Sequence, residues 1–369
     1  MSTTSGRTPL HLAPGALLSA RAASKPLPVA VITEPTGSHL NLFFHGFAKC
    51  PEITQVAIAD PTGKTFEIAR KLLGPHASSL KTFSDYRQML REVRPALTVV
   101  TLEAHHNAEV LTAALTADSH VISEKPPCVK LSEFESAAKL AKSRGRHLML
   151  AMATRGNPAA RKAHEIIERG WIGKQYGVTM NWVGDQTRLK NPAYHTKWLA
   201  YKAKAGGGKL AFHGIHYLDL IHYITGDRIE RVAGFCRNVG GQPVEVEDAA
   251  VLSLQFRKGM VGTLNTGYYL DKDNSNLIHL WGELGWFRFD PFFPLEWYST
   301  HPDAPRGVQK TGEVGQSVEY DVTIREAVLA AADMGAPFMN TEESLSVVRV
   351  VFAGYRASET GTSQTVTVA

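Results

Sequence analysis

Cysteine is scarce in this 369-residue sequence: only Cys50, Cys128 and Cys236 occur, and no C-x-x-C pair is present. Scattered thiols indicate reduced cysteines in a cytoplasmic protein, not a disulfide framework or zinc site. No apolar run approaches the roughly 18 residues needed to cross a membrane, so no span is predicted. The lysines and arginines form no dense cluster and the formal net charge is only +5, so nucleic-acid binding is not expected.

The composition is that of a globular chain, with 44% hydrophobic and 20% charged residues. This length predicts two domains. Residues 1–26 form an N-terminal extension in which His11 and Pro14 interrupt the only apolar run. The interruption favours a polar or disordered arm over a secretory signal, which stays the alternative.

Strands and helices alternate from residue 28 to about residue 150. Apolar strands are predicted at 28–33, 54–60, 96–103 and 120–126, and helical spacing at 39–50, 63–74, 86–93 and 107–117. This alternation with short connections is typical of a parallel sheet with crossover helices. We therefore predict a dinucleotide-binding Rossmann domain over residues 27–150.

The pattern changes after residue 150. A helix at 158–170 precedes long alternating runs at 176–184, 228–239, 248–257, 260–270 and 277–290. These runs predict a large, open, mainly antiparallel or mixed sheet in an α+β domain spanning 151–369. A last helix, 342–358, is expected to pack back toward the Rossmann domain.

The turn after the first strand has few of the glycines that a dinucleotide loop normally carries. In TEPTGSH only Gly37 is present, together with the candidate cofactor-binding residues Thr33, Pro35, Thr36, Ser38 and His39. A helix N-terminus still offers unpaired N–H groups to a pyrophosphate, so a site with altered phosphate contacts is predicted.

Asp60 ends the second strand, 23 residues after Gly37 (60 − 37). This is close to the spacing of an acid that binds a ribose 2′-hydroxyl, and its charge would repel a 2′-phosphate, so NAD is preferred over NADP. The alternative is that Asp60 simply belongs to a turn with Pro61, Thr62 and Gly63.

Two further clusters follow later strands, at the edge where a doubly wound sheet binds its ligand. They contribute the candidate cofactor-binding residues Glu103, His105, Asn107, Glu124 and Lys125. The Pro-Pro pair after Lys125 would hold this lysine at the cofactor edge.

A glycine triplet, 206–208, opens a helical segment that contains Phe212, His213, His216 and Asp219. Spacings of three and four residues would place these four side chains on one face. The triplet is expected to be flexible and to open onto a cleft. No metal site is predicted, because H-x-x-H lacks both the spacing and the glutamate of the zinc-protease pattern.

The sequence resembles the Gfo/Idh/MocA family of sugar and polyol oxidoreductases over residues 28–368. The resemblance rests on HVISEKPP, on GGGKLAFHGIHYLD and on VEDAAVLSLQFRKGMVGTLN, in this order and spacing. It implies NAD-dependent oxidation of a secondary alcohol, with Lys125 and His216 as catalytic residues. The acid that usually precedes this histidine by four residues is Phe212 here, and His213 could take over part of its role.

The resemblance also implies a small carbohydrate or polyol substrate and a homodimer or homotetramer. Weaker candidates for the substrate pocket, beside His213 and His216, are Arg155, Tyr194, His195, Lys197, Trp198 and Tyr268. Two other functions stay open: a redox glycosidase that oxidises, eliminates and reduces, and a non-catalytic sugar or nucleotide sensor.

Overall fold

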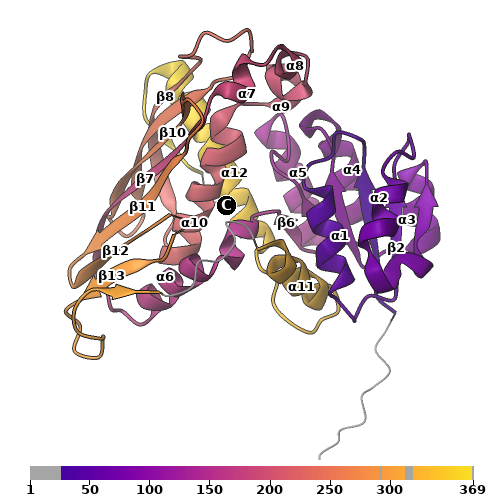
Figure 1. Cartoon of the computed structure of the whole chain (residues 1–369), viewed down its shortest axis with the longest axis horizontal. Helices are drawn as coiled ribbons and strands as arrows, with labels where there is room; N and C mark the ends of the chain where they lie inside the picture. Colours follow the sequence, from indigo (N-terminus) through magenta and orange to yellow (C-terminus); the bar gives the residue numbers. More distant parts are fainter. Residues whose placement is uncertain (1–25, 291–292, 312–318, 368–369) are drawn as a thin grey trace, which may run out of the picture.

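The computed structural model describes residues 26–290, 293–311 and 319–367. All but the last residue of the predicted N-terminal extension lies outside this part of the chain. Two sheets with helices between them make up the molecule (Figure 1).

The first sheet is parallel and has the strand order β3-β2-β1-β4-β5-β6. Its strands are β1 (Pro28–Thr33), β2 (Gln55–Ala59), β3 (Lys81–Phe83), β4 (Leu97–Thr101), β5 (His120–Ser123) and β6 (Leu148–Leu150). The crossover helices are α1 (Leu40–Ala48), α2 (Phe66–Leu72), α3 (Tyr86–Val93), α4 (Ala104–Thr116) and α5 (Leu131–Ser143), with a 3₁₀ turn at Gly74–Ser79. This is the order of a doubly wound dinucleotide-binding sheet.

Both faces of the parallel sheet are buried, as its apolar strands predict. Val29 and Val31 of β1 join one core cluster, and Ala30 and Ile32 join the other. The short edge strand β3 was not predicted, because three residues carry too little periodicity.

The second sheet is mixed, with the order β14-β13-β12-β11-β7-β10-β9-β8-β15. Its strands are β7 (Gln175–Asp185), β8 (Ile229–Arg237), β9 (Ala249–Phe256), β10 (Val261–Leu270), β11 (Ser275–Gly282), β12 (Gly285–Phe289), β13 (Glu296–Ser299), β14 (Gln309–Lys310) and β15 (Gln364–Thr365). Strand β7 runs parallel to β10, and the other neighbours are antiparallel. The alternating run 277–290 is a hairpin of β11 and β12.

Helices cover the inner face of this sheet. They are α6 (Pro158–Glu168), the π-helix η4 (Leu210–Gly214), α10 (Ile215–Thr225) and α12 (Thr341–Thr360). Helix α12 lies against β8 and also contacts α5 and β6, so it joins the two halves of the molecule (Figure 1). Short helices connect β7 to η4: α7 (Thr187–Lys190), α8 (Pro192–His195), η3 (Trp198–Ala200) and α9 (Lys202–Ala205).

Two elements outside the alternating pattern pack near the first sheet. The 3₁₀ turn η2 (Ala153–Gly156) follows β6, and α11 (Tyr320–Ala331) packs against α1. The sequence analysis did not predict α11. Its packing brings residue 320 to the carboxyl edge of a sheet formed by residues 28–150.

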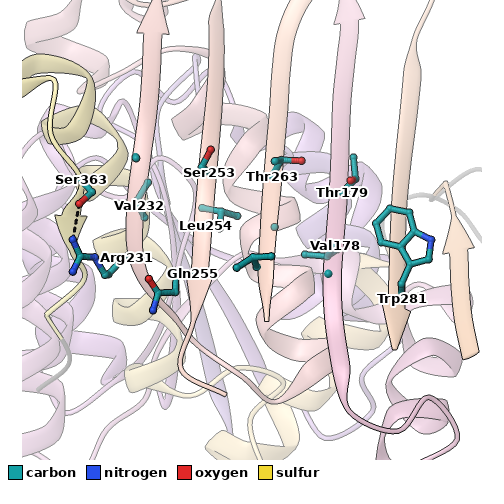
Figure 2. A pocket seen from close by; sticks show the side chains of 14 residues that line it. Val178, Thr179, Arg231, Val232, Ser253, Leu254, Gln255, Thr263, Trp281 and Ser363 are labelled. Atoms are coloured by element: carbon teal, nitrogen blue, oxygen red, sulfur yellow. Dashed lines mark hydrogen bonds between the residues drawn. The ribbon is translucent and has the colours of Figure 1, made fainter. Parts of the chain in front are cut away.

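The outer face of the nine-stranded sheet has no helix over it (Figure 1). Along β9, buried residues alternate with the exposed Val251, Ser253 and Gln255. A shallow hollow crosses this face from Arg231 to Trp281 (Figure 2). Val261 and Trp281 are 60% and 40% exposed, so part of this surface is apolar.

None of the helices in the described ranges combines the length and the apolar character needed to cross a lipid bilayer.

Candidate active site

The turn after β1 is held tightly against the sheet. A Cβ on Gly37 would lie 2.3 Å from Thr33 Oγ1 and 2.6 Å from the Thr101 carbonyl oxygen. Thr33 donates its hydroxyl hydrogen bond to the carbonyls of Glu34 and Thr101, so this hydroxyl serves the turn itself. Thr101 in turn donates to the Ser38 carbonyl. The one glycine of the turn is therefore required by close packing.

The N-terminus of α1 is open to a ligand. Its first turn follows His39, a left-handed residue (φ 56°) whose side chain makes no capping hydrogen bond. A cavity of about 610 Å³ lies beside it, lined among others by Pro35, Gly37, Lys64 and Thr65. Uncapped helix N–H groups beside a cavity are suited to an anionic group such as a pyrophosphate. Thr36 lies at the same edge, with its hydroxyl 3.3 Å from Glu103 Oε1.

Asp60 does not face this cavity as a free carboxylate. The side chain is fully buried, and each of its two oxygens accepts two hydrogen bonds, from Thr62 and from Thr65. Burial opposes ionisation of Asp60, but these hydrogen bonds outweigh it and hold the pKa below its ordinary value. The expected ribose contact is thus not available, and the turn role, the alternative from sequence, fits the structure.

Glu124 and Lys125 follow β5 with a cis bond between Lys125 and Pro126. The Glu124 carboxylate is buried and accepts hydrogen bonds from the His39 ring (2.9 Å), the Tyr320 hydroxyl (2.8 Å) and the Lys125 backbone (3.0 Å). Glu124 therefore ties β5, α1 and α11 together. Lys125 is half-buried and points its Nζ to 5.8 Å from the Phe212 ring centroid.

The candidate residues that follow β4, Glu103, His105 and Asn107, lie partly at the surface and partly in the core. Glu103 and His105 lie 3.7 Å apart and are partly exposed at the start of α4. Asn107 is fully buried, donates to the Pro126 carbonyl at 3.3 Å and leaves its Oδ1 without a hydrogen-bond partner in the described part of the chain. Asn107 therefore connects helix α4 to the Glu124–Pro127 turn.

The glycine triplet, expected from sequence to be flexible, is closely packed on both sides. A Cβ on Gly207 would meet the Tyr355 hydroxyl at 1.9 Å, and one on Gly208 would meet the Glu247 carbonyl oxygen at 1.9 Å. The Glu247 carboxylate accepts hydrogen bonds from the Gly208 and Leu210 backbones and from the Tyr355 hydroxyl. These contacts fix the start of the helix that carries the two histidines.

His213 and His216 meet the indole of Trp182. Their ring centroids lie 5.2 Å and 5.4 Å from that of Trp182. The Tyr268 hydroxyl lies 3.2 Å from His213 Nδ1. His216 is only 7% exposed, and its Nδ1 is buried without a partner among the described residues.

Both histidines are neutral at pH 7 in this environment. Burial holds the pKa of His216 well below its ordinary value, and the positive charges of Lys125 and His39 add to the effect. Burial likewise lowers the pKa of His213, followed by the repulsion of Lys209 and Lys125. A neutral imidazole with a free ring nitrogen can accept a proton.

Arg155 and Asp219 form a structural ion pair. Arg155 donates from Nε (2.9 Å) and Nη2 (2.7 Å) to the two oxygens of Asp219, and Glu343 lies 3.3 Å from its Nη1. Both partners are at most 3% exposed. The expectation that Arg155 contacts substrate is wrong, because its guanidinium is fully engaged. Asp219 accepts both of these bonds, so its carboxylate is committed to Arg155.

The remaining substrate candidates are divided by position. Tyr194 and Tyr268 are buried on the same side as His213, with Arg188 5.2 Å and 4.9 Å from their ring centroids. Trp198 is buried against Phe212 (5.8 Å), so both are packing residues. His195 bonds to the Leu189 carbonyl at 2.6 Å, and Lys197 is exposed. These placements leave Tyr194 and Tyr268 as the better candidates.

Two family models match this chain. Residues 33–152 match the model described as "Oxidoreductase family, NAD-binding Rossmann fold", and residues 160–288 match "GFO/IDH/MocA C-terminal domain". The chain belongs to the Gfo/Idh/MocA oxidoreductase family. The parallel sheet is therefore the family's NAD-binding Rossmann domain.

The relatives of this Gfo/Idh/MocA protein include enzymes of sugar metabolism. A levoglucosan dehydrogenase from Pseudarthrobacter phenanthrenivorans is 25% identical over 243 residues, which are 59% of this chain and 62% of that protein. Among the first relatives found, the chain spans only about half of their length, 42% to 62%.

The fold is shared over nearly the whole chain. A Kribbella flavida oxidoreductase domain protein has 25% identity and a TM-score of 0.81, covering 93% of this chain and 99% of that one. A levoglucosan dehydrogenase in complex with NADH and levoglucosan also gives 0.81, with 20% identity over 94% and 100% of the two chains.

Sequence analysis missed four residues that build the site: Trp182, Lys209, Glu247 and Tyr320. A signal existed for two of them. Lys209 directly follows the glycine triplet, and Glu247 lies within one of the family motifs, VEDAA. Trp182 and Tyr320 come from distant segments and gave no local signal.

Proposed function

We propose that this chain is an NAD-dependent oxidoreductase that transfers hydride between the nicotinamide and a secondary hydroxyl of a sugar, glycoside or cyclitol. The observation that supports the proposal is His216, a neutral imidazole that lies beside Trp182 and close enough to Lys125 for that charge to lower its pKa. A neutral imidazole next to a lysine can accept the proton of a substrate hydroxyl while the lysine hydrogen-bonds the oxygen.

The residues fit NAD at the edge of the parallel sheet. The uncapped N-terminus of α1 and the cavity beside Gly37 would hold the pyrophosphate, and Glu103 and His105 border the same edge. NAD, when bound, supplies the acceptor for the hydride. The NAD preference that rested on Asp60 now needs another source, since that carboxylate is saturated.

His216 and Lys125 divide the chemistry between them. His216 takes the proton of the substrate hydroxyl as the hydride leaves its carbon. Lys125, fixed by the bonds that Glu124 makes, hydrogen-bonds the substrate oxygen and stabilises the charge that develops on it. His213, held by Tyr268, is the candidate that supports this proton transfer in place of the acid lost at Phe212.

The test is turnover followed at 340 nm with NAD and a panel of sugars, glycosides and cyclitols. His216→Ala and Lys125→Ala should each lower turnover by roughly 10² or more, while NAD binding measured by calorimetry is retained. His213→Ala should lower turnover too, in folded, NAD-bound protein. The control is His195→Ala, whose ring bonds only to its own loop. Bound NAD without turnover of any member would favour a sensor and contradict the proposal.

A redox glycosidase is the second candidate. The observation in its favour is the replacement of the usual acid by Phe212 together with the His213–Tyr268 pair, which offers a second proton-transfer group near His216. Release of aglycone from a glycoside without net NADH would identify it. A steady rise at 340 nm would identify the dehydrogenase.

We also propose that copies of this chain associate through the outer face of the nine-stranded sheet. Val251, Val261 and Trp281 expose apolar surface there. No helix covers this face in the described part of the chain (Figure 1). A homodimer or homotetramer would bury this surface.

A further inference from the structure

Lys209 is a buried cation without an anionic partner. Its side chain is 1% exposed, and its Nζ lies 4.1 Å from the ring centroid of Tyr268 and 6.0 Å from that of Trp182. Gly184 leaves room for it, because a Cβ there would come within 3.1 Å of Nζ. Across residues 26–290, 293–311 and 319–367, the partners found for this Nζ are these two rings, and no hydrogen bond or ion pair from it is found.

A second cation shares the same aromatic ring. The Arg188 guanidinium lies 4.9 Å from the Tyr268 ring centroid and 5.2 Å from that of Tyr194. In the described part of the chain it makes no ion pair, and its one side-chain hydrogen bond is to the Tyr194 hydroxyl at 3.5 Å. Two cations thus lie against one tyrosine with no carboxylate between them.

The charges of these two cations and of Lys125 all act on the His213 ring. Lys209, Lys125 and Arg188 all lower the pKa of His213, after the larger effect of burial. Burial, followed by the repulsion of Arg188, lowers the pKa of Lys209 itself to about 7. No acidic group offsets either effect.

The nearest acids along the chain are already engaged. The Glu247 carboxylate accepts from two backbone N–H groups and from Tyr355, as described above. Asp185, next to Gly184 on β7, accepts from Thr187 and from the Lys272 backbone. Neither acid is therefore free to pair with Lys209, which is buried, or with Arg188, which is exposed beside it.

We propose that Lys209 and Arg188 bind the carboxylate of an anionic sugar substrate, a uronate or sugar acid, whose ring lies near His213 and His216. The proposal rests on the proposed function and names its substrate class. A buried, unpaired ammonium is unfavourable, so a site that keeps one is suited to a ligand of opposite charge. The indole of Trp182, which lies between His213, His216 and Lys209, supplies an apolar wall that a sugar ring can pack against.

A carboxylate suits this site better than a phosphate. Phosphates typically bind to the free N–H groups of a helix N-terminus. Here Gly208 and Leu210, at the start of that helix, already donate to Glu247, whose negative charge would also repel a dianion. A carboxylate, which is flat and singly charged, can be bound between the ammonium of Lys209 and the guanidinium of Arg188.

The first experiment compares D-glucuronate with D-glucose on protein saturated with NADH, using calorimetry to measure Kd. Glucuronate should bind at least ten-fold more tightly. Lys209→Met should weaken glucuronate by roughly ten- to hundred-fold and leave glucose within about two-fold. Lys204→Met is the matched control, because Lys204 is an exposed lysine on α9 that should leave both affinities unchanged.

A second measurement needs no variant. At about pH 8 the free Lys209 is partly neutral, so a bound carboxylate should draw a proton onto it. Calorimetry in two buffers of different ionisation enthalpy should then record uptake of up to one proton per glucuronate and none for glucose. The groups facing Lys209 that could share this proton are His213, Tyr268 and Arg188. The pKa of His213 is held well below its ordinary value by burial, and those of Tyr268 and Arg188 are raised, so none of the three takes up or releases a proton near pH 8.

Equal affinity for the two sugars, a glucuronate preference that survives in Lys209→Met, or binding without proton uptake would each overturn the inference. Tighter binding of glucose 6-phosphate than of glucuronate would overturn the choice of a carboxylate. Turnover of neutral sugars with no glucuronate preference would refute this inference and leave the proposed function standing. Lys209-dependent binding of glucuronate with no turnover would support this inference and refute the proposed function.

Discussion

The buried pair of Arg155 and Asp219 gives the sharpest prediction about stability. We consider Asp219→Asn, which keeps the shape of the side chain and removes its charge. Two charge-assisted hydrogen bonds, at 2.9 Å and 2.7 Å, lose their anionic acceptor in a site that is at most 3% exposed. Removing one partner of a buried pair typically costs about 3–5 kcal/mol. Glu343 stays 3.3 Å from Arg155 and offsets part of the loss, so about 3 kcal/mol is expected.

Urea denaturation followed by tryptophan fluorescence measures this loss. The matched control is Asp118→Asn, which removes the acceptor of an exposed pair with Arg144 (3.0 Å) and should cost less than about 1 kcal/mol. A similar loss in both variants would refute the buried-pair argument. Turnover of folded Asp219→Asn should be unchanged, because the carboxylate faces Arg155; a ten-fold or larger fall in kcat would mean that Asp219 orients His216 after all.

Three other predictions follow from the structure. Asp60→Ala should lower the free energy of unfolding by about 1–3 kcal/mol, because four hydrogen bonds lose their acceptor. If stability is unchanged and the difference between NAD and NADP affinities narrows instead, Asp60 binds the ribose after all. The pKa of His120 is lowered to about 4, mainly by burial and then by the charges of His147 and Arg146. The folded state therefore binds fewer protons than the unfolded chain, and the free energy of unfolding should fall by up to about 3 kcal/mol as the pH drops from 6.5 to 4. In His120→Gln, denaturation curves across this range should have a shallower pH dependence, and an unchanged one would refute the assignment. Trp281→Glu on the outer sheet face should give a monomer by light scattering, with the exposed loop variant Val308→Glu as control; a monomeric parent at micromolar concentration would contradict association through this face.

Local sequence patterns were sufficient for most of the fold. The apolar strands β1, β4 and β5 and the alternating strands β8 to β10 follow from periods that each segment carries by itself. The turn contacts of Asp60 were also visible locally, since its partners Thr62 and Thr65 lie two and five residues away. A spacing of 23 residues from Gly37 was the weaker guide, because it says nothing about which groups saturate the carboxylate.

The site itself depended on contacts between distant segments. Arg155 meets Asp219 across 64 residues, and Glu124 meets Tyr320 across 196. The π-helical turn at η4 also had no local signal in the sequence. By itself, the sequence determined the element types of the two sheets and the family, because local periods and short motifs carry both, and it nominated Lys125 and His216 as the catalytic candidates. Only the tertiary structure decided which charges are paired and which are left for a ligand, because pairing is a property of distance in space.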